Sequence, residues 1–256
     1  MKITQVRNAT LIVEFAGLRF LIDPMLAPKG SFPAFAGTLN SDRSNPLVDL
    51  PVAIDELVDV DAVIVTHMHR DHWDDTAKES LPKSLPLFVQ DERDAAAMQA
   101  AGFTSVRILS DHGGFEDVSL TKTAGQHGSD EAMEKIGARL GSVCGVVMRH
   151  PEEKTLYIAG DTIWNEHVAA ALRTHAPDVI VLNCGDARIN GVGSIIMGQH
   201  DVLEVCRAAP NAMVVASHME AVNHAMLSRH ALRLFLEETG LAARVLVPAD
   251  GETIAA

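Results

Sequence analysis

The sequence has few of the features that mark secreted or membrane proteins. It has 3 cysteines, and Cys144, Cys184 and Cys206 form no C-x-x-C pair and leave one over, so we expect no disulfide framework. No apolar run approaches the roughly 18 residues that a membrane span requires. The opening MKITQVRNATLIVEF has no basic segment followed by an apolar one, so we expect no signal peptide. These absences predict a cytoplasmic protein that does not act at a membrane.

Positive charge is also scarce. Lys and Arg number 21 against 34 Asp and Glu, which gives a formal net charge of −13. Nucleic-acid binding depends on Lys and Arg that release counterions from phosphates, so we expect no nucleic-acid partner. Apolar residues make up 47% of the 256-residue chain. This share excludes intrinsic disorder, and the length predicts a single domain over residues 1–256.

Aromatic residues are few, whereas histidine is abundant. There are 1 Tyr and 2 Trp but 12 His. Because the neutral imidazole is the commonest metal ligand in proteins, the positions of these histidines carry most of the functional information.

Short apolar runs, typical of buried strands, recur along the whole chain. We expect strands within residues 1–23 and at 62–66, 87–89, 106–109, 118–123, 143–148, 155–159, 179–182, 212–216 and 245–247. Helical spacing is found at 92–101, 164–172, 202–209 and 227–235, the last with Ser228 as a possible N-cap and Gly240 as its stop. Without strict alternation of strand and helix, the pattern favours an α/β protein with mixed sheets covered by helices.

Residues 25–50 have no apolar periodicity and many Pro, Gly and Asn, so we expect a long loop. Long loops inside compact domains are often functional. Met25, Phe32 and Phe35 either form an apolar wall over a site or anchor the loop to the core.

One cluster of polar residues is hard to explain by packing. The strand at 62–66 leads directly into the sequence H-M-H-R-D-H. His67 and His69 alternate with an apolar residue, so both imidazoles can point the same way. Asp71 and His72 lie on the next turn and can reach a second metal. Imidazole with carboxylate is a zinc-type ligand set, with Fe or Mn as alternatives.

The H-x-H-x-D-H pattern at residues 67–72 resembles the metal-binding signature of the metallo-β-lactamase superfamily. Residues 8–24, ending in L-I-D-P, are similar to the opening strand pair of that family, and residues 156–162 resemble its strand that ends in a bridging Asp. The resemblance spans most of the chain. It implies an αββα sandwich of two mixed β-sheets flanked by helices, with two metals at one edge between the sheets. Within the superfamily, the layout most resembles the compact branch that includes ascorbate-6-phosphate lactonase-like proteins.

Further ligands are expected where neighbouring strands end. His127 follows the strand at 118–123 and would complete a three-histidine site with His67 and His69. Asp161 follows the strand at 155–159, where a short carboxylate can bridge two ions. His218 follows the strand at 212–216 and would join Asp71 and His72 on the second metal.

Such a site implies a metal-dependent hydrolase. Two ions about 3.5–4 Å apart, with zinc favoured, would lower the pKa of a bound water towards about 7. Asp71 could orient or deprotonate that water in addition to binding metal. The reaction class is hydrolysis of a small ester, lactone or phosphoester. The alternative is a metal-binding sensor or scaffold without catalysis.

Other branches of the superfamily fit less well. A nuclease would bring an extra domain and a basic surface. The diiron oxidoreductases carry Glu where this chain has His69. Many β-lactamases proper are exported and use a Cys near the second metal, whereas here Asp161 takes that role. A small metabolic substrate is therefore expected. The sequence leaves open whether the chain forms an oligomer.

The remaining histidines are assigned more simply. Glu220 and His224, close in sequence to His218, are candidates for substrate contact or proton transfer. His200 is ambiguous. Five others are expected at the surface, namely His112, His150, His167, His175 and His230. Cys184 ends a strand without an adjacent base, so a catalytic thiol is not expected.

Overall fold

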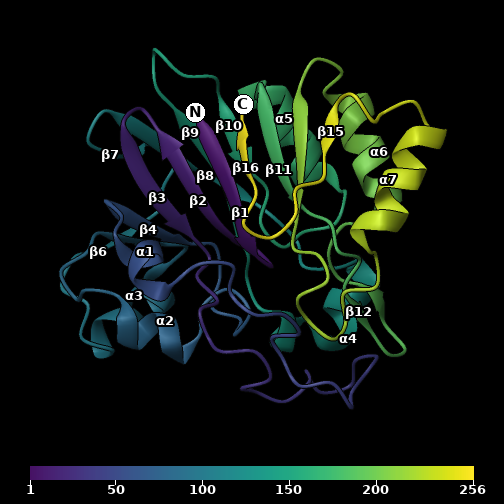
Figure 1. The fold of residues 1–256 in the computed structure, drawn as a ribbon. Coiled ribbons are helices and arrows are strands. Elements are labelled where there is room, and N and C mark those ends of the chain that lie inside the picture. Colours follow the sequence, from purple (N-terminus) through teal and green to yellow (C-terminus); the bar gives the residue numbers. More distant parts are fainter.

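Two seven-stranded sheets make up the centre of the protein in the computed structural model, which describes all residues 1–256 (Figure 1). In spatial order, the first sheet contains β16 (Thr253–Ala255), β1 (Lys2–Arg7), β2 (Thr10–Phe15), β3 (Leu18–Ile22), β4 (Ala62–Val65), β5 (Leu87–Val89) and β6 (Val106–Ile108). The pairs from β3 to β6 are parallel and the others antiparallel, so this sheet is mixed.

The second sheet is also mixed. In spatial order it contains β15 (Val245–Leu246), β14 (Met213–Ser217), β11 (Val179–Asn183), β10 (Leu156–Ile158), β9 (Cys144–Arg149), β8 (Val118–Ala124) and β7 (Gly113–Phe115). The pairs from β15 to β10 are parallel, and those from β10 to β7 are antiparallel. A separate hairpin is formed by β12 (Arg188–Ile189) and β13 (Gly193–Ser194).

Helices cover the outer face of each sheet. The first sheet is covered by α1 (Ile54–Val58), α2 (Asp75–Ser80) and α3 (Glu92–Ala100), and the second by α5 (Glu166–His175), α6 (Gln199–Ala208) and α7 (Arg229–Glu238). An apolar core that includes Phe20, Val146 and Ile158 fills the space between the sheets. The predicted αββα sandwich is confirmed.

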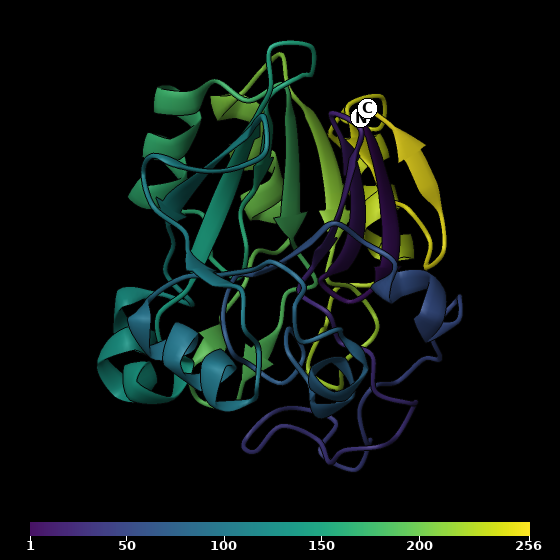
Figure 2. The same ribbon diagram turned by 90° about the vertical axis from the view of Figure 1, so that its left-hand side faces the viewer.

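The long loop lies at one end of this sandwich. Residues 25–50 form no helix or regular strand, and they lie at the bottom of both views, near α4 (Asp130–Leu140) (Figures 1 and 2). The two termini meet at the opposite end (Figure 2), where Ala256 N donates to Met1 O. The carboxyl ends of β4, β8, β10 and β14 point towards the loop end.

The sequence predicted the strands and helices that bury an apolar side. The helix expected from Trp164 begins at Glu166, because the Asn165 side chain accepts hydrogen bonds from the first turn of α5. Ser228 caps α7 as predicted. The pattern did not reveal α1, α2, α4, β7, β12, β13 or β16. These are short or, in α4, kinked at Ile136, so they offer no sustained periodicity.

Reverse turns link the first three strands. Asn8 and Ala16 both adopt positive φ, 56° and 51°, and Gly17 follows at 78°. This left-handed conformation suits Asn and Gly in tight hairpins.

A fully buried arginine attaches the long loop to the first sheet. Arg7 lies at the end of β1, and its guanidinium donates to Val48 O at 3.0 Å, Met25 O at 2.6 Å and Ala27 O at 2.8 Å. Burial lowers the pKa of Arg7 to about 10, although Asp74 and Asp250 oppose this change. The side chain therefore replaces water as the partner of three loop carbonyls.

We expect Arg7→Met to lower the free energy of unfolding by about 3 kcal/mol, because three buried carbonyls lose a charged donor. Urea unfolding measures the change. Lys2→Met in the same strand is the matched control. Lys2 is exposed and pairs with Glu14 at 3.2 Å, so its loss should cost less than about 0.5 kcal/mol. Equal losses in the two variants would show that Arg7 does not hold the loop.

Candidate metal centre

All seven residues predicted as metal ligands meet at the loop end of the sandwich. His67, His69, Asp71 and His72 follow β4 in the first sheet. The other three follow strands of the second sheet, with His127 after β8, Asp161 after β10 and His218 after β14. These three strands run in the same direction. Both β8 and β10 are antiparallel to β9, and β14 is parallel to β11, which is itself parallel to β10. Their carboxyl ends therefore lie at one edge.

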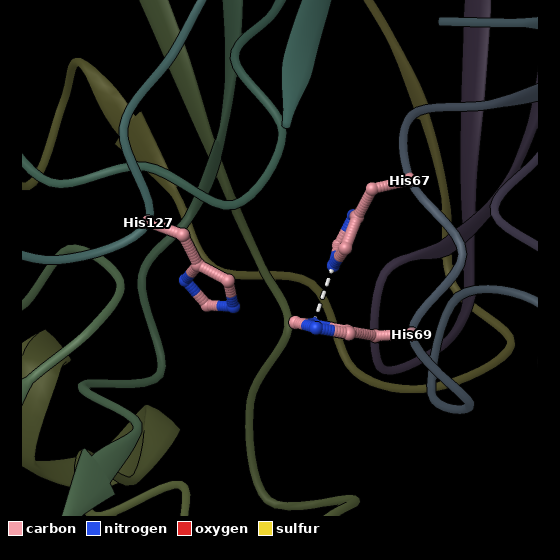
Figure 3. A group of neighbouring side chains, drawn as sticks. All are labelled: His67, His69 and His127. Carbon is pink, nitrogen blue, oxygen red and sulfur yellow. Dashed lines mark hydrogen bonds between the residues drawn. The ribbon is translucent and has the colours of Figure 1, made fainter. Parts of the chain in front are cut away.

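His67, His69 and His127 form a first group (Figure 3). His67 Nε2 lies 3.0 Å from His69 Nδ1. The far nitrogen of His69 donates to Arg139 O at 3.3 Å, and that of His127 donates to Ile195 O at 2.8 Å. Because a carbonyl can only accept, each ring carries its proton on the side away from the group. The nitrogens facing the common space are therefore unprotonated in the neutral rings.

Asp71, His72 and His218 form a second group. His218 Nε2 lies 3.2 Å from both His72 Nε2 and Asp71 Oδ2. The other nitrogen of His72 donates to Asp23 Oδ2 at 2.9 Å. This carboxylate fixes the ring with Nε2 towards the group, as carboxylates that accept from the outer ring nitrogen do for metal-binding histidines.

Asp161 joins the two groups. Its Oδ1 accepts a hydrogen bond from Asn183 Nδ2 at 2.8 Å. Its Oδ2 lies 3.1 to 3.8 Å from four imidazole nitrogens, the Nε2 atoms of His72, His127, His218 and His67. One carboxylate oxygen is thus held at the point where the groups meet.

The electrostatics of the cluster favour positive charge beside Asp161. Burial would raise the pKa of Asp161, but His72 and His218 hold it well below its usual range. Burial lowers the pKa of His67 well below its usual range, and its histidine neighbours add to this effect. Burial would also lower the pKa of His72, but Asp161 and Asp23 outweigh burial and raise it well above its usual range. The carboxylates of Asp161 and Asp23 thus stabilise positive charge among these imidazoles.

Three residues that the sequence argument did not assign support the cluster. Asp23 accepts from Thr66 N and Thr66 Oγ1, both at 2.7 Å, as well as from His72. Asn183 holds Asp161. Asn8 Nδ2 lies 3.1 Å from Asp71 O and 3.2 Å from His218 Nε2. Asp23 directly follows β3, which neighbours β4. Asp161 was identified because it follows an apolar strand, and the same criterion could have identified Asp23.

A cavity of about 140 Å³ opens onto the cluster. Its apolar walls are Phe35, Leu140, Ile189 and Ile195, and its polar lining is Thr38, His69, Arg70, Asp71, His127, Arg139, Asp161 and His224. Both arginines are engaged elsewhere. The Arg139 guanidinium donates to Ala36 O, and that of Arg70 lies 4.6 Å from the centre of the Phe32 ring.

The two candidates for substrate contact lie in different places. His224 lines the cavity, is 6% exposed, and its ring centre lies 4.9 Å from that of Phe35. Glu220 does not line it, because its carboxylate binds Arg229 at 2.8 Å. His200 is exposed and packs against Phe235, outside the cavity.

The apolar residues of the long loop divide between the two roles that the sequence left open, which are anchoring the loop and forming a wall over the site. Met25 and Phe32 are buried and pack with Ala221 and Val222, so they anchor the loop. Phe35 forms part of the cavity wall.

No helix is long and apolar enough to cross a membrane. A family model described as a beta-lactamase superfamily domain matches residues 18–219. Among curated proteins, the chain is 50% identical over 254 residues to the UPF0173 protein YddR of Bacillus subtilis (strain 168), with 99% of each chain covered. It is 27% identical over 195 residues to a UPF0173 metal-dependent hydrolase of Methanosphaera stadtmanae, with 72% of each covered.

Two solved structures match the whole fold. An isothiocyanate hydrolase from Delia radicum gut bacteria is 47% identical, with a TM-score of 0.97 over 100% of this chain and 99% of that one. A possible metal-dependent hydrolase from Veillonella parvula is 42% identical, with a TM-score of 0.98 and the same coverage. The sandwich, the cluster and these relatives agree, and the chain belongs to the metallo-β-lactamase superfamily as a metal-dependent hydrolase.

Proposed function

We propose that this protein hydrolyses small isothiocyanates at a centre of two divalent metal ions, with zinc favoured over Mn and Fe. The observation that carries the proposal is the small cavity, which has apolar walls above the His/Asp cluster. The isothiocyanate hydrolase that matches over the whole chain at 47% identity supports it. The partner is then a small molecule, and the proposed location is the cytoplasm.

Isothiocyanates suit this cavity better than the phosphoesters among the substrates expected from the sequence. Besides the metal ions, a phosphate is usually held by free cationic or amide donors of the protein. Here the Arg139 guanidinium is bound to Ala36 O and that of Arg70 lies over Phe32. The N=C=S group is narrow and uncharged, and an apolar substituent on its nitrogen can contact Phe35, Ile189 and Ile195.

The donor set fits metal ions. Zinc takes imidazole nitrogens at about 2.0–2.1 Å, which places neighbouring ligand atoms about 3.3 Å apart in a tetrahedron. The closest pairs of imidazole nitrogens are His67 with His69 at 3.0 Å and His72 with His218 at 3.2 Å. His72 Nε2 faces His218 Nε2 although Asp23 already holds the proton of its other nitrogen. The proton that the raised pKa of His72 retains between these nitrogens would give way to a bound cation.

We assign His67, His69 and His127 to one ion and Asp71, His72 and His218 to the other, with Asp161 contacting both. When bound, the ions would act as Lewis acids that polarise the substrate and acidify water.

The reaction replaces the C=N double bond of R–N=C=S with a C=O double bond at the central carbon. The oxygen of water bonds to this carbon, the C=N bond is broken completely, and both protons of the water end on nitrogen, which yields R–NH₂ and carbonyl sulfide (O=C=S). Asp71 would receive the first of these protons at its carboxylate and orient the water. Its position is held by Asn8, which donates to Asp71 O.

His224 would contact the substrate nitrogen. Burial lowers its pKa to about 4, so the ring is neutral near pH 7. Nδ1 is buried without a hydrogen-bond partner, and a buried N–H without an acceptor is unfavourable, so the proton is assigned to Nε2. The ring can then donate a hydrogen bond to the nitrogen and orient the N=C=S axis. Glu220, paired with Arg229, has no part in this assignment.

The function is tested with benzyl isothiocyanate. We expect the zinc-loaded protein to release benzylamine, and we expect the metal-free protein to lose this activity and regain it when zinc is restored. Amine release is measured against zinc in buffer alone. Hydrolysis of a lactone or phosphoester instead would assign another substrate. No turnover on any of them, with metal bound, would favour the sensor or scaffold alternative.

Metal content should separate ligands from substrate contacts. We expect two zinc ions per chain, and about one in His127→Ala and in His218→Ala, because each removes a ligand of one ion. His224→Ala should keep both ions and lose turnover. Elemental analysis after gentle reconstitution measures the content. A His224 variant that loses zinc, or wild-type protein that never exceeds one ion, would contradict the assignment.

Asp71→Asn tests the proposed base. The amide keeps an oxygen but cannot accept the proton, so turnover should fall on the order of 10² or more. The fold should persist, as judged by urea unfolding, because the apolar core lies between the sheets. The matched control is Asp75→Asn, an exposed carboxylate that pairs with Lys78 at 2.7 Å. Near-full activity of Asp71→Asn with both ions bound would show that Asp71 is not the base.

A further inference from the structure

A closed loop within the long loop forms one wall of the cavity. We call residues Phe32–Asn45 the strap. Its two ends pair with each other, since Phe32 N donates to Asn45 O at 2.9 Å and Asn45 N to Phe32 O at 2.7 Å. Between these ends, Phe35 and Thr38 line the cavity. The position of the strap therefore sets the size of the space above the cluster.

The strap is bound mainly to one asparagine side chain. Asn223 is 1% exposed, and its Oδ1 accepts from Asn45 Nδ2 at 2.9 Å and from Phe35 N at 3.3 Å. Its Nδ2 donates to Thr38 Oγ1 at 2.8 Å and to Leu39 O at 2.7 Å. The oxygen and the nitrogen of this amide thus each make two hydrogen bonds, all of them to the strap.

The main-chain atoms of Asn223 bind the strap as well. Asn223 N donates to Asn45 Oδ1 at 2.8 Å, and Asn223 O accepts from Asn40 Nδ2 at 2.9 Å. The strap has few other polar contacts, which include Asn190 N to Gly37 O at 2.9 Å and the Arg139 guanidinium to Ala36 O. Asn223 therefore contacts the strap repeatedly between Phe35 and Asn45.

The chemistry of this site requires asparagine. The strap presents two donors to Oδ1 and two acceptors to Nδ2. Aspartate has the same shape but cannot donate, so its second oxygen would face the Leu39 carbonyl. A buried polar group left without a partner costs far more than a hydrogen bond gained at the surface.

Asn223 also acts on the opposite wall, because the next residue is His224. The His224 ring meets the Phe35 ring of the strap edge to face, with 4.9 Å between their centres. One residue thus places the strap wall and fixes the backbone that carries the proposed substrate contact.

We infer that Asn223 is a positioning residue for substrate specificity, which holds the strap close over the cluster and so favours short isothiocyanate substituents over long ones. The inference rests on the proposed function for the identity of the substrate. It does not involve metal binding, since Asn223 contacts none of the seven proposed ligands.

The test is Asn223→Asp in the zinc-loaded protein, assayed with benzyl isothiocyanate and the longer 4-phenylbutyl isothiocyanate. We expect zinc content to stay at the wild-type value and the KM for the benzyl compound to rise about tenfold, with kcat changed by less than about threefold. The preference for the short substrate, as a ratio of kcat/KM values, should fall about tenfold. Amide hydrogen exchange should become faster in residues 32–45.

Asn211→Asp is the matched control, because Asn211 is exposed in the turn before β14, at the opposite end of that strand from His218. It should behave as wild type in all four measurements. If Asn223→Asp does not fold, Asn45→Ala removes two of the hydrogen bonds between the strap and Asn223 from the strap side, at a residue that does not line the cavity, and is read in the same way.

Unchanged strap exchange and unchanged selectivity would overturn the inference, and loss of zinc from Asn223→Asp would show that it acts through the ligands instead. A wild-type protein that hydrolyses neither isothiocyanate would refute the proposed function. The specificity role would fall with it, whereas hydrogen exchange would still decide whether Asn223 holds the strap.

Discussion

The carboxylate of Asp161 is the constraint on which the rest of the site depends. A buried, ionised carboxylate is strongly unfavourable unless positive charge lies beside it. Asn183 occupies one oxygen, and the other faces four imidazole nitrogens within 3.8 Å. Those imidazoles come from both sheets. The αββα sandwich therefore serves to bring two sheet edges together around one negative oxygen, and the proposed metal ions would supply the charge that this oxygen requires.

The orientation of the rings is determined outside the cluster. Asp23 holds His72, Ile195 O holds His127 and Arg139 O holds His69, each through the nitrogen that points away from the common space. A carbonyl or carboxylate at that position leaves the inner nitrogen free to bind a cation. These supporting groups come from separate segments of the chain. The site is thus specified by contacts that a local motif does not contain.

This separation explains how far the sequence was informative. The H-x-H-x-D-H pattern is local, and His127, Asp161 and His218 could be placed because each follows an apolar strand. The same reasoning applied to β3 would have found Asp23. In contrast, the different places of Glu220 and His224 could not be predicted. His218 and Glu220 both adopt positive φ, 60° and 62°, and these backbone turns direct Glu220 to Arg229 and His224 to the cavity. The contacts of Asn223 with residues about 180 positions earlier leave no local pattern at all.

Function within one fold is set by the loops that surround a shared scaffold. The His/Asp cluster can activate water against many electrophiles, so it determines the type of reaction and says little about the substrate. The substrate must instead be recognised by groups that vary independently of the ligands. In this protein the groups that line the cavity beside the ligands, and that we propose for this role, are the strap, the end of α4 and His224. The strap has no regular hydrogen-bonded structure of its own, and its position depends on the side chain of Asn223. A change of one buried amide can therefore alter the cavity without changing the cluster, which gives such a fold a direct way to acquire new substrates while its chemistry is retained.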